Sequence, residues 1–110
     1  MWVFSKDGFF SAVKAKDSKK IVVRARFNGD LEKLLAAIGK EEVKVVESGQ
    51  SDYRFRVELP SDDWVRYLAM TAMQIDYTNF KASLADGERH DVYLKVWSIL
   101  KKAQEAKKRG

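Results

Sequence analysis

The chain has 110 residues, the size of one domain, and 45% of them are hydrophobic, which excludes a disordered chain. It contains no cysteine, which excludes a disulfide framework and thiolate chemistry, and its net charge of +5 permits an anionic partner. The N-terminal residues lack the layout of a signal peptide, and no apolar run approaches the roughly 20 residues of a membrane span. We therefore expect one cytoplasmic domain over residues 1–110, without a membrane partner.

The first elements expected are strands. The Asp-Gly step in Lys6-Asp7-Gly8 favours positive backbone dihedrals and predicts a hairpin turn, although residues 2–5 are also consistent with a simple lead into a strand at 9–14. Residues 21–27 alternate between apolar and polar positions, which predicts a half-buried antiparallel strand. Its inner face would carry Ile21, Val23, Ala25 and Phe27, and its outer face Val22, Arg24 and Arg26.

A short helix is expected next. Asn28-Gly29-Asp30 turns the chain, and Asp30 is predicted to be the N-cap, accepting from free backbone N–H groups. Gly39 is predicted to end the helix, because it adopts the left-handed C-terminal conformation without steric cost. Between them the i, i+3, i+4, i+7 spacing indicates one apolar stripe, made of Leu31, Leu34, Leu35 and Ile38.

Two further strands and a second helix follow. Residues 43–47 and 53–59 are predicted strands, and Pro60 ends the second because it cannot donate to a ladder. Ser61 is predicted to cap the next helix, with acidic residues near its positive end. From residue 67 to 75 this helix is apolar on most sides, so we expect it to be deeply buried.

The element order β-β-α-β-β-α predicts an α+β domain. Two ββα units would pair into a four-stranded antiparallel sheet with the helices on one face, a permuted ferredoxin-like arrangement. Residues 77–108 add C-terminal helices, with a break at Asp86-Gly87. The last helix carries a predicted apolar stripe and ends in a basic tail, about residues 101–110, that we expect to fray. The stripe comprises Val92, Tyr93, Val96, Trp97 and Leu100.

The outer face of the sheet is the leading candidate site. If the apolar positions of the alternating strands pack on the helices, four arginines point away from them and could grip phosphates. A nearby aromatic ring could stack on a base. The predicted nucleic-acid-binding residues are Arg24, Arg26, Arg54, Arg56, Lys14 and Phe10. The alternative is a solvated face on which arginines pair with Glu47 and Glu58.

A second candidate is a polar cluster of Asp76, Asn79 and His90, which would suit a small hydrolase. The simpler interpretation makes Asp76 and Asn79 caps of a helix break and the acids around His90 first-turn helix acids. One histidine without cysteine is a poor set of ligands for a transition metal, and the sequence contains no phosphate loop or nucleophile elbow. We expect no metal and no cofactor.

Several short motifs spread over the chain form one pattern: Met1-Trp2, Gly8-Phe9-Phe10-Ser11, Val23-Arg24-Ala25-Arg26, Asp30-Leu31-Glu32, Asp52-Tyr53-Arg54, Ile75-Asp76-Tyr77, Asn79-Phe80-Lys81, and Tyr93 with Val96-Trp97. With this pattern the chain resembles a family of small, functionally uncharacterised bacterial and phage proteins. The resemblance implies a compact single domain and no particular chemistry. Relatives carry a histidine after the tyrosine of the last motif, where this chain has Leu94, and this difference argues against catalysis by that helix.

The sequence favours a non-enzymatic binding module, with the phosphate backbone of a nucleic acid as the leading ligand. A protein-interaction module is the alternative, as a homodimer or with another partner, using surface from Trp2, Tyr93 or Trp97. A small hydrolase is the third hypothesis.

Overall fold

The computed structural model describes residues 1–109 and the side chains of residues 1–108. It divides into two compact units, Met1–Ile75 and Asp76–Gly110, and each is described by itself. The single domain over residues 1–110 stays a prediction, and the last residue of the predicted tail, Gly110, lies outside the described residues.

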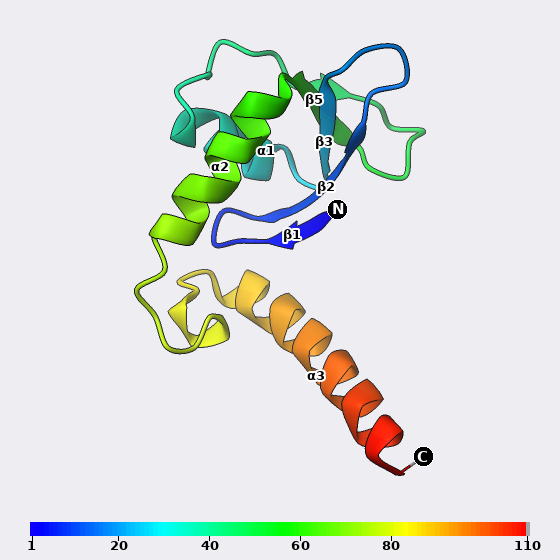
Figure 1. Ribbon diagram of the computed structural model, residues 1–110, viewed down its shortest axis with the longest axis vertical. Coiled ribbons are helices and arrows are strands. Elements are labelled where there is room, and N and C mark those ends of the chain that lie inside the picture. The colour runs from blue at the N-terminus through cyan, green and yellow to red at the C-terminus, as the bar shows by residue number, and fades with distance from the viewer. Residues whose placement is uncertain (110) are drawn as a thin grey trace. The chain divides into compact units, whose positions relative to one another are not determined.

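A five-stranded antiparallel sheet forms the centre of the first unit, which confirms the α+β class (Figure 1). The predicted number of four strands is wrong, because residues 2–4 form a strand of their own. This strand pairs with residues 9–11, and two further backbone hydrogen bonds extend the pairing at its ends. The Ala12 N–H donates to the Met1 carbonyl (2.8 Å) at one end, and the Ser5 N–H donates to the Gly8 carbonyl (2.9 Å) at the turn. The strands lie in the order β1-β2-β3-β5-β4, with bounds β1 Trp2–Phe4, β2 Phe9–Lys14, β3 Ile21–Ala25, β4 Val46–Glu47 and β5 Phe55–Leu59.

Two helices, α1 (Asn28–Ala37) and α2 (Ser61–Met73), cover one face of this sheet (Figure 1). The alternating residues of β3 and β5 that point toward them are buried or half-buried, as the sequence predicts, and Phe10 and Ala12 of β2 are buried with them. The buried hydrophobic cluster comprises Phe10, Ala12, Val23, Ala25, Leu31, Leu34, Leu35, Ile38, Val57, Leu59, Trp64 and Tyr67. We call this the inner face of the sheet, and the opposite one the outer face.

Helix α1 begins earlier than predicted. It starts at Asn28, so Asp30 lies inside its first turn and is not the N-cap. The Asp30 side chain is buried and its Oδ2 accepts from the Phe9 N–H (3.4 Å), which ties the helix to β2. Phe27 is 66% exposed and not on the inner face, because β3 ends at Ala25 and the chain turns into the helix. The predicted end at Gly39 is confirmed by its φ of 70°.

Helix α2 begins at Ser61 as predicted, but the Ser61 side chain makes no capping hydrogen bond. The expected deep burial of its second half is also wrong. Trp64 and Tyr67 are buried, whereas Met73 is 86% exposed and Ile75 just beyond the helix is 59% exposed. The reason is geometric, because a single sheet can cover only one stripe of a helix, and positions 64 and 67 occupy that stripe.

A buried polar network joins α2 to the β1–β2 turn. The Tyr67 hydroxyl lies 2.8 Å from the Ser5 Oγ and donates to the Asp7 Oδ2 at 2.8 Å. Ser5 Oγ also accepts from the Asp7 N–H (3.2 Å). Burial raises the pKa of the Tyr67 phenol far above its ordinary value, and the nearby Asp7 carboxylate adds to this shift. The network holds the turn, and therefore β1, against the helix.

The raised pKa of Tyr67 predicts a loss of stability in alkali. The unfolded phenol ionises near pH 10, whereas the folded one stays protonated, so the stabilisation is complete below about pH 10 and is lost above it. The free energy of unfolding should fall by about 1.4 kcal/mol per pH unit from this group. In Tyr67→Phe this contribution should be absent. Urea unfolding of the wild-type protein and of Tyr67→Phe between pH 8 and 11.5 checks this prediction. A difference in the free energy of unfolding that does not change with pH would contradict it.

The second unit contains a 3-10 turn, η1 (Lys81–Ser83), and the long helix α3 (Gly87–Arg109). The predicted break at Asp86-Gly87 is confirmed, since the Asp86 Oδ1 accepts from the Arg89 N–H (3.1 Å) and caps the helix. Within the described residues α3 continues to Arg109, and the expected fraying of the tail stays a prediction. None of the helices within residues 1–109 is long and apolar enough to cross a membrane.

The predicted stripe of α3 is only partly buried. Tyr93 is 5% exposed and stacks on Phe80 (5.8 Å between ring centroids). Val92, Trp97 and Leu100 are exposed. Periodicity alone therefore overstates how much of this helix is covered.

Candidate nucleic-acid interface

One cross-strand row on the outer face crosses all five strands. Trp2 of β1 pairs with Ser11 of β2, Ser11 pairs with Arg24 of β3, Arg24 pairs with Arg56 of β5, and Arg56 pairs with Val46 of β4. Residues that pair directly in an antiparallel sheet point to the same side. The register therefore places two adjacent arginines and, one strand beyond Ser11, a tryptophan on the face opposite to the helices. We call these five residues the central row.

Arg24 is held in place by neutral groups. Its Nη2 donates to the Ser11 Oγ (2.7 Å), and its guanidinium lies 4.7 Å from the centre of the Tyr53 ring. Ser11 is 1% exposed beneath this contact. A hydroxyl and a ring orient the guanidinium but do not neutralise it, so its positive charge remains available to an anion.

Arg56 lies directly opposite Arg24 in the register. Its Nε is buried and has no hydrogen-bond partner within residues 1–109. Neither arginine has a carboxylate partner in that part of the chain. Two like charges opposite each other destabilise a sheet, and an anion bound between them would relieve the repulsion.

The other two predicted arginines are charge-paired. Arg26 contacts the Asp52 carboxylate at 3.3 Å, and Arg54 contacts Glu47 at 2.7 Å. Both pairs are largely exposed and contribute little to stability. The alternative interpretation, a face of paired charges, therefore holds for Arg26 and Arg54, but not for Arg24 and Arg56.

Aromatic rings that were not predicted for the nucleic-acid site lie in the central row and beside it. Phe9 contacts Trp2 edge to face (5.7 Å), stacks on Phe4 (4.6 Å) and lies 6.4 Å from Tyr53. Tyr53 is buried and has the guanidiniums of both Arg24 and Arg26 against its ring. Trp2 is 70% exposed. Two of these rings could have been placed from the sequence. Phe9 lies two positions before Ser11 in the same strand and so points to the same face, and Trp2 faces Ser11 across the hairpin.

Two residues of the predicted set do not belong to this face. Phe10 is 0% exposed and packs edge to face on Tyr67 (5.6 Å), so its predicted role in stacking on a base is wrong. The cause is alternation along β2, which sends Phe10 inward and Phe9 outward. Lys14 is exposed but pairs with Ile21, which packs against the core, so its position belongs to the inner side.

The polar cluster is explained by local structure. The Asn79 Oδ1 accepts from the Ala82 N–H (3.1 Å) and lies 3.4 Å from the Lys81 Nζ, so its side chain is bonded to the neighbouring turn η1. The His90 Nδ1 lies 3.5 Å from an Asp91 oxygen, and Asp76 is exposed. Within residues 1–109 no three His, Cys, Asp or Glu side chains are grouped to hold a metal ion.

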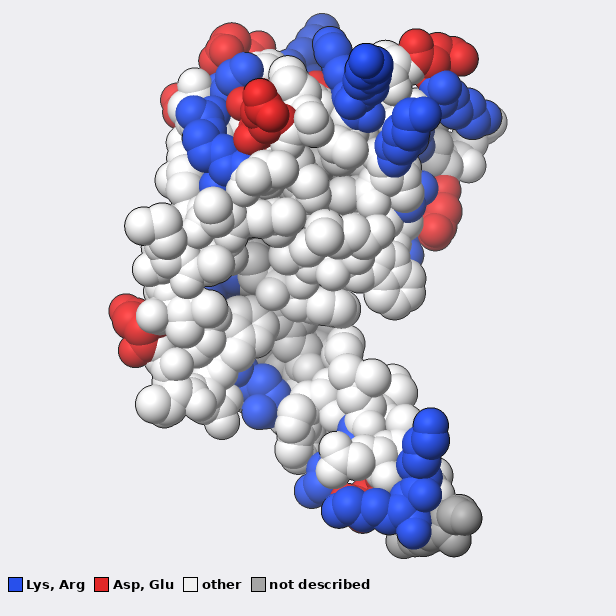
Figure 2. Space-filling model, viewed as in Figure 1, with Lys and Arg blue, Asp and Glu red and all other residues white. Residues whose placement is uncertain are grey.

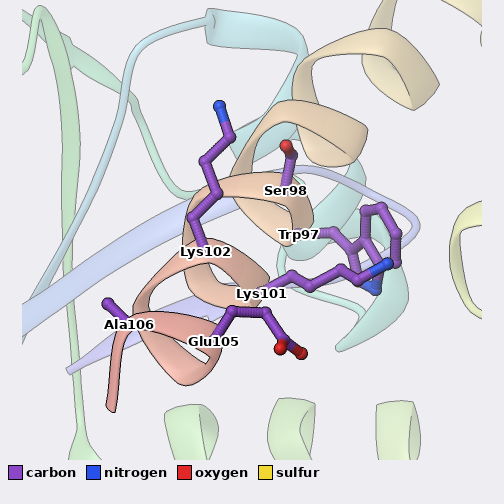
Figure 3. A pocket seen from close by; sticks show the side chains of 6 residues that line it. All are labelled: Trp97, Ser98, Lys101, Lys102, Glu105 and Ala106. Atoms are coloured by element: carbon purple, nitrogen blue, oxygen red, sulfur yellow. The ribbon is translucent and has the colours of Figure 1, made fainter. Parts of the chain in front are cut away.

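The basic tail forms a separate feature on α3. The Lys81 and Lys101 ammonium groups lie 4.9 Å and 5.1 Å from the centre of the Trp97 ring. Figure 3 shows a shallow hollow beside this ring that is lined by α3 alone, with the Lys101 chain running toward Trp97 and the Lys102 chain pointing the other way. A hollow with a single helix as its wall has too few converging groups to be a small-molecule site.

Lysine and arginine side chains are distributed unevenly over the surface. In the view of Figure 2 they gather on the first unit where the β2–β3 loop lies, interspersed with acidic residues, and on the C-terminal half of α3. Further side chains of both signs lie at the upper left of the first unit, on the side of α1 and α2, and the surface between these groups is mostly uncharged in the same view. The positive charge is therefore not spread evenly around either unit.

Comparisons of the chain with protein-family models, with curated proteins and with solved structures found no match.

Proposed function

We propose that the protein is a non-enzymatic nucleic-acid-binding module and that the outer face of its sheet is the binding surface. The observation that carries the proposal is the pair of Arg24 and Arg56, which lie opposite each other without a carboxylate partner in residues 1–109. Each guanidinium offers a planar fork of donors that matches a phosphate. Arg26 contributes positive charge nearby but is shared with Asp52.

The contacts of Arg24 support this use, because its guanidinium is already positioned. Arg24 is positioned by Ser11 and Tyr53, so little side-chain entropy is lost when a phosphate binds.

We also propose that the four strands β2-β3-β5-β4 form the permuted ferredoxin-like core predicted from the sequence. The order of the strands and the covering of one face by α1 and α2 support that relationship.

Replacing both Arg24 and Arg56 with alanine is expected to weaken nucleic-acid binding about tenfold or more, because two charge-assisted contacts are lost. Fluorescence polarisation with labelled oligonucleotides across a salt series measures it. The slope of log K against log[salt] should become shallower by about 1.4 for a single strand, since each phosphate contact contributes about 0.7.

The matched control is Arg26→Ala with Arg54→Ala, which removes the same total charge but from two arginines that already have carboxylate partners. It should weaken binding less and change the slope less. Equal effects of the two double variants would show a general charge effect and contradict the assignment to Arg24 and Arg56. A wild-type protein that binds no nucleic acid at low salt would overturn the proposed function.

A protein-interaction module is the second candidate, and exposed apolar residues on α3 favour it. Val92, Ile99 and Leu100 are each more than half exposed. Tyr93, which the sequence analysis also assigned to such a surface, is buried and unsuited to that role. Failure of the binding experiment would make this the leading candidate.

A further inference from the structure

We propose that the bound nucleic acid is single-stranded and that Trp2 stacks on one of its bases. This inference rests on the proposed function and names the class of ligand for the same face. Its starting observation is that Trp2 and Arg24 share the central row, with only Ser11 between them. Strands in a sheet are about 4.8 Å apart, so the two backbone positions are separated by about 10 Å.

The Trp2 ring is accessible. It is 70% exposed, and its contact with Phe9 is edge to face, with an angle of 87° between the ring planes. In this geometry Phe9 covers at most one face of the indole, so the other face can take a base. Phe9 is itself stacked on Phe4 at 4.6 Å, so the indole lies at the edge of a small aromatic cluster.

The arrangement discriminates between single and double strands. In a duplex the flat faces of the bases are stacked on one another, so an indole on a sheet face can stack on a base only if the duplex is first unstacked, which costs free energy. A single strand offers unstacked bases, and stacking on an aromatic ring is tolerant of base identity because every base has a flat π face. Arg24 and Arg56 then bind the backbone on the same face where Trp2 binds the base.

The experiment compares three labelled ligands of equal length: a single strand, the same strand with abasic sites throughout, and a duplex. The abasic strand keeps the phosphates and lacks the bases. Wild-type protein should bind the base-bearing single strand about tenfold more tightly than the abasic one, in keeping with the usual effect of one stacked base. DNA and RNA versions of the strand are both used, and tight binding of either supports the inference.

Trp2→Ala should reduce this preference to about one, and it should leave the salt slope unchanged because no phosphate contact is lost. Phe27→Ala is the matched control, since Phe27 is an equally exposed aromatic residue (66%) that lies outside the strands. It should keep the full preference. Circular dichroism of both variants verifies that they are folded.

The two proposals can fail separately. Equal binding of abasic and base-bearing strands by the wild-type protein, or tighter binding of the duplex, would overturn the inference while the arginine pair still bound a phosphate backbone. A preference for bases that Trp2→Ala leaves intact would overturn the assignment to Trp2. Absence of binding to all three ligands at low salt would overturn both proposals.

Discussion

Replacing Phe10 with alanine is expected to lower the free energy of unfolding by about 3–5 kcal/mol. The ring is completely buried between the sheet and α2, with edge-to-face contacts to Trp64 (6.5 Å) and Tyr67 (5.6 Å). Without the ring, the protein buries less apolar surface on folding, and a cavity remains that the surrounding strand and helix cannot fill completely. Urea unfolding followed by circular dichroism measures the change.

Trp2→Ala is the control for this prediction. Trp2 lies on the neighbouring strand, but its side chain is mostly exposed. We therefore expect the free energy of unfolding of Trp2→Ala to remain within about 1 kcal/mol of the wild-type value. A Phe10→Ala protein that is as stable as the wild type and has lost nucleic-acid binding would contradict the structure, because it would place Phe10 on the binding face.

The second large effect is expected at Gly8, where alanine should destabilise the protein by about 1–3 kcal/mol. The reason is steric and not the backbone dihedral that the Asp-Gly step suggests, since Gly39 is the only glycine with positive φ among the described residues. A Cβ at Gly8 would overlap with the carboxyl group of Asp30, which is buried and accepts from the Phe9 N–H. Thermal and urea unfolding measure the loss.

Two variants test this explanation. Gly49→Ala is the matched control, because an added Cβ there meets nothing within 4 Å, and its effect should be small. Asp30→Gly removes the whole side chain that an alanine at Gly8 would meet, its Cβ included, so the additional cost of Gly8→Ala should shrink in that background. A cost that is the same with and without Asp30 would disprove the steric explanation.

The sequence by itself determined the α+β class and, for the two clearly alternating strands, the side of the sheet to which each residue points. Alternation in residues 21–25 and 55–59 correctly separated the buried apolar positions from Arg24 and Arg56, because a strand presents successive side chains to opposite faces. The turn at Lys6-Asp7-Gly8, the apolar stripe of α1, its end at Gly39 and the break at Asp86-Gly87 were also readable, since each depends on residues close together in the chain.

Only the tertiary structure decided which arginines are neutralised and which rings accompany them. Arg26 meets Asp52, which is 26 residues away, and Tyr53 receives Arg24 and Arg26 across the sheet. Such contacts depend on strand order and on the path of loops, which a local pattern does not contain. The contacts of Asp30 and Tyr67 with the β1–β2 hairpin also depend on the tertiary structure, because their partners are distant in the sequence. The burial of α2 depends on it too, since the extent of the sheet decides how much of this apolar helix is covered.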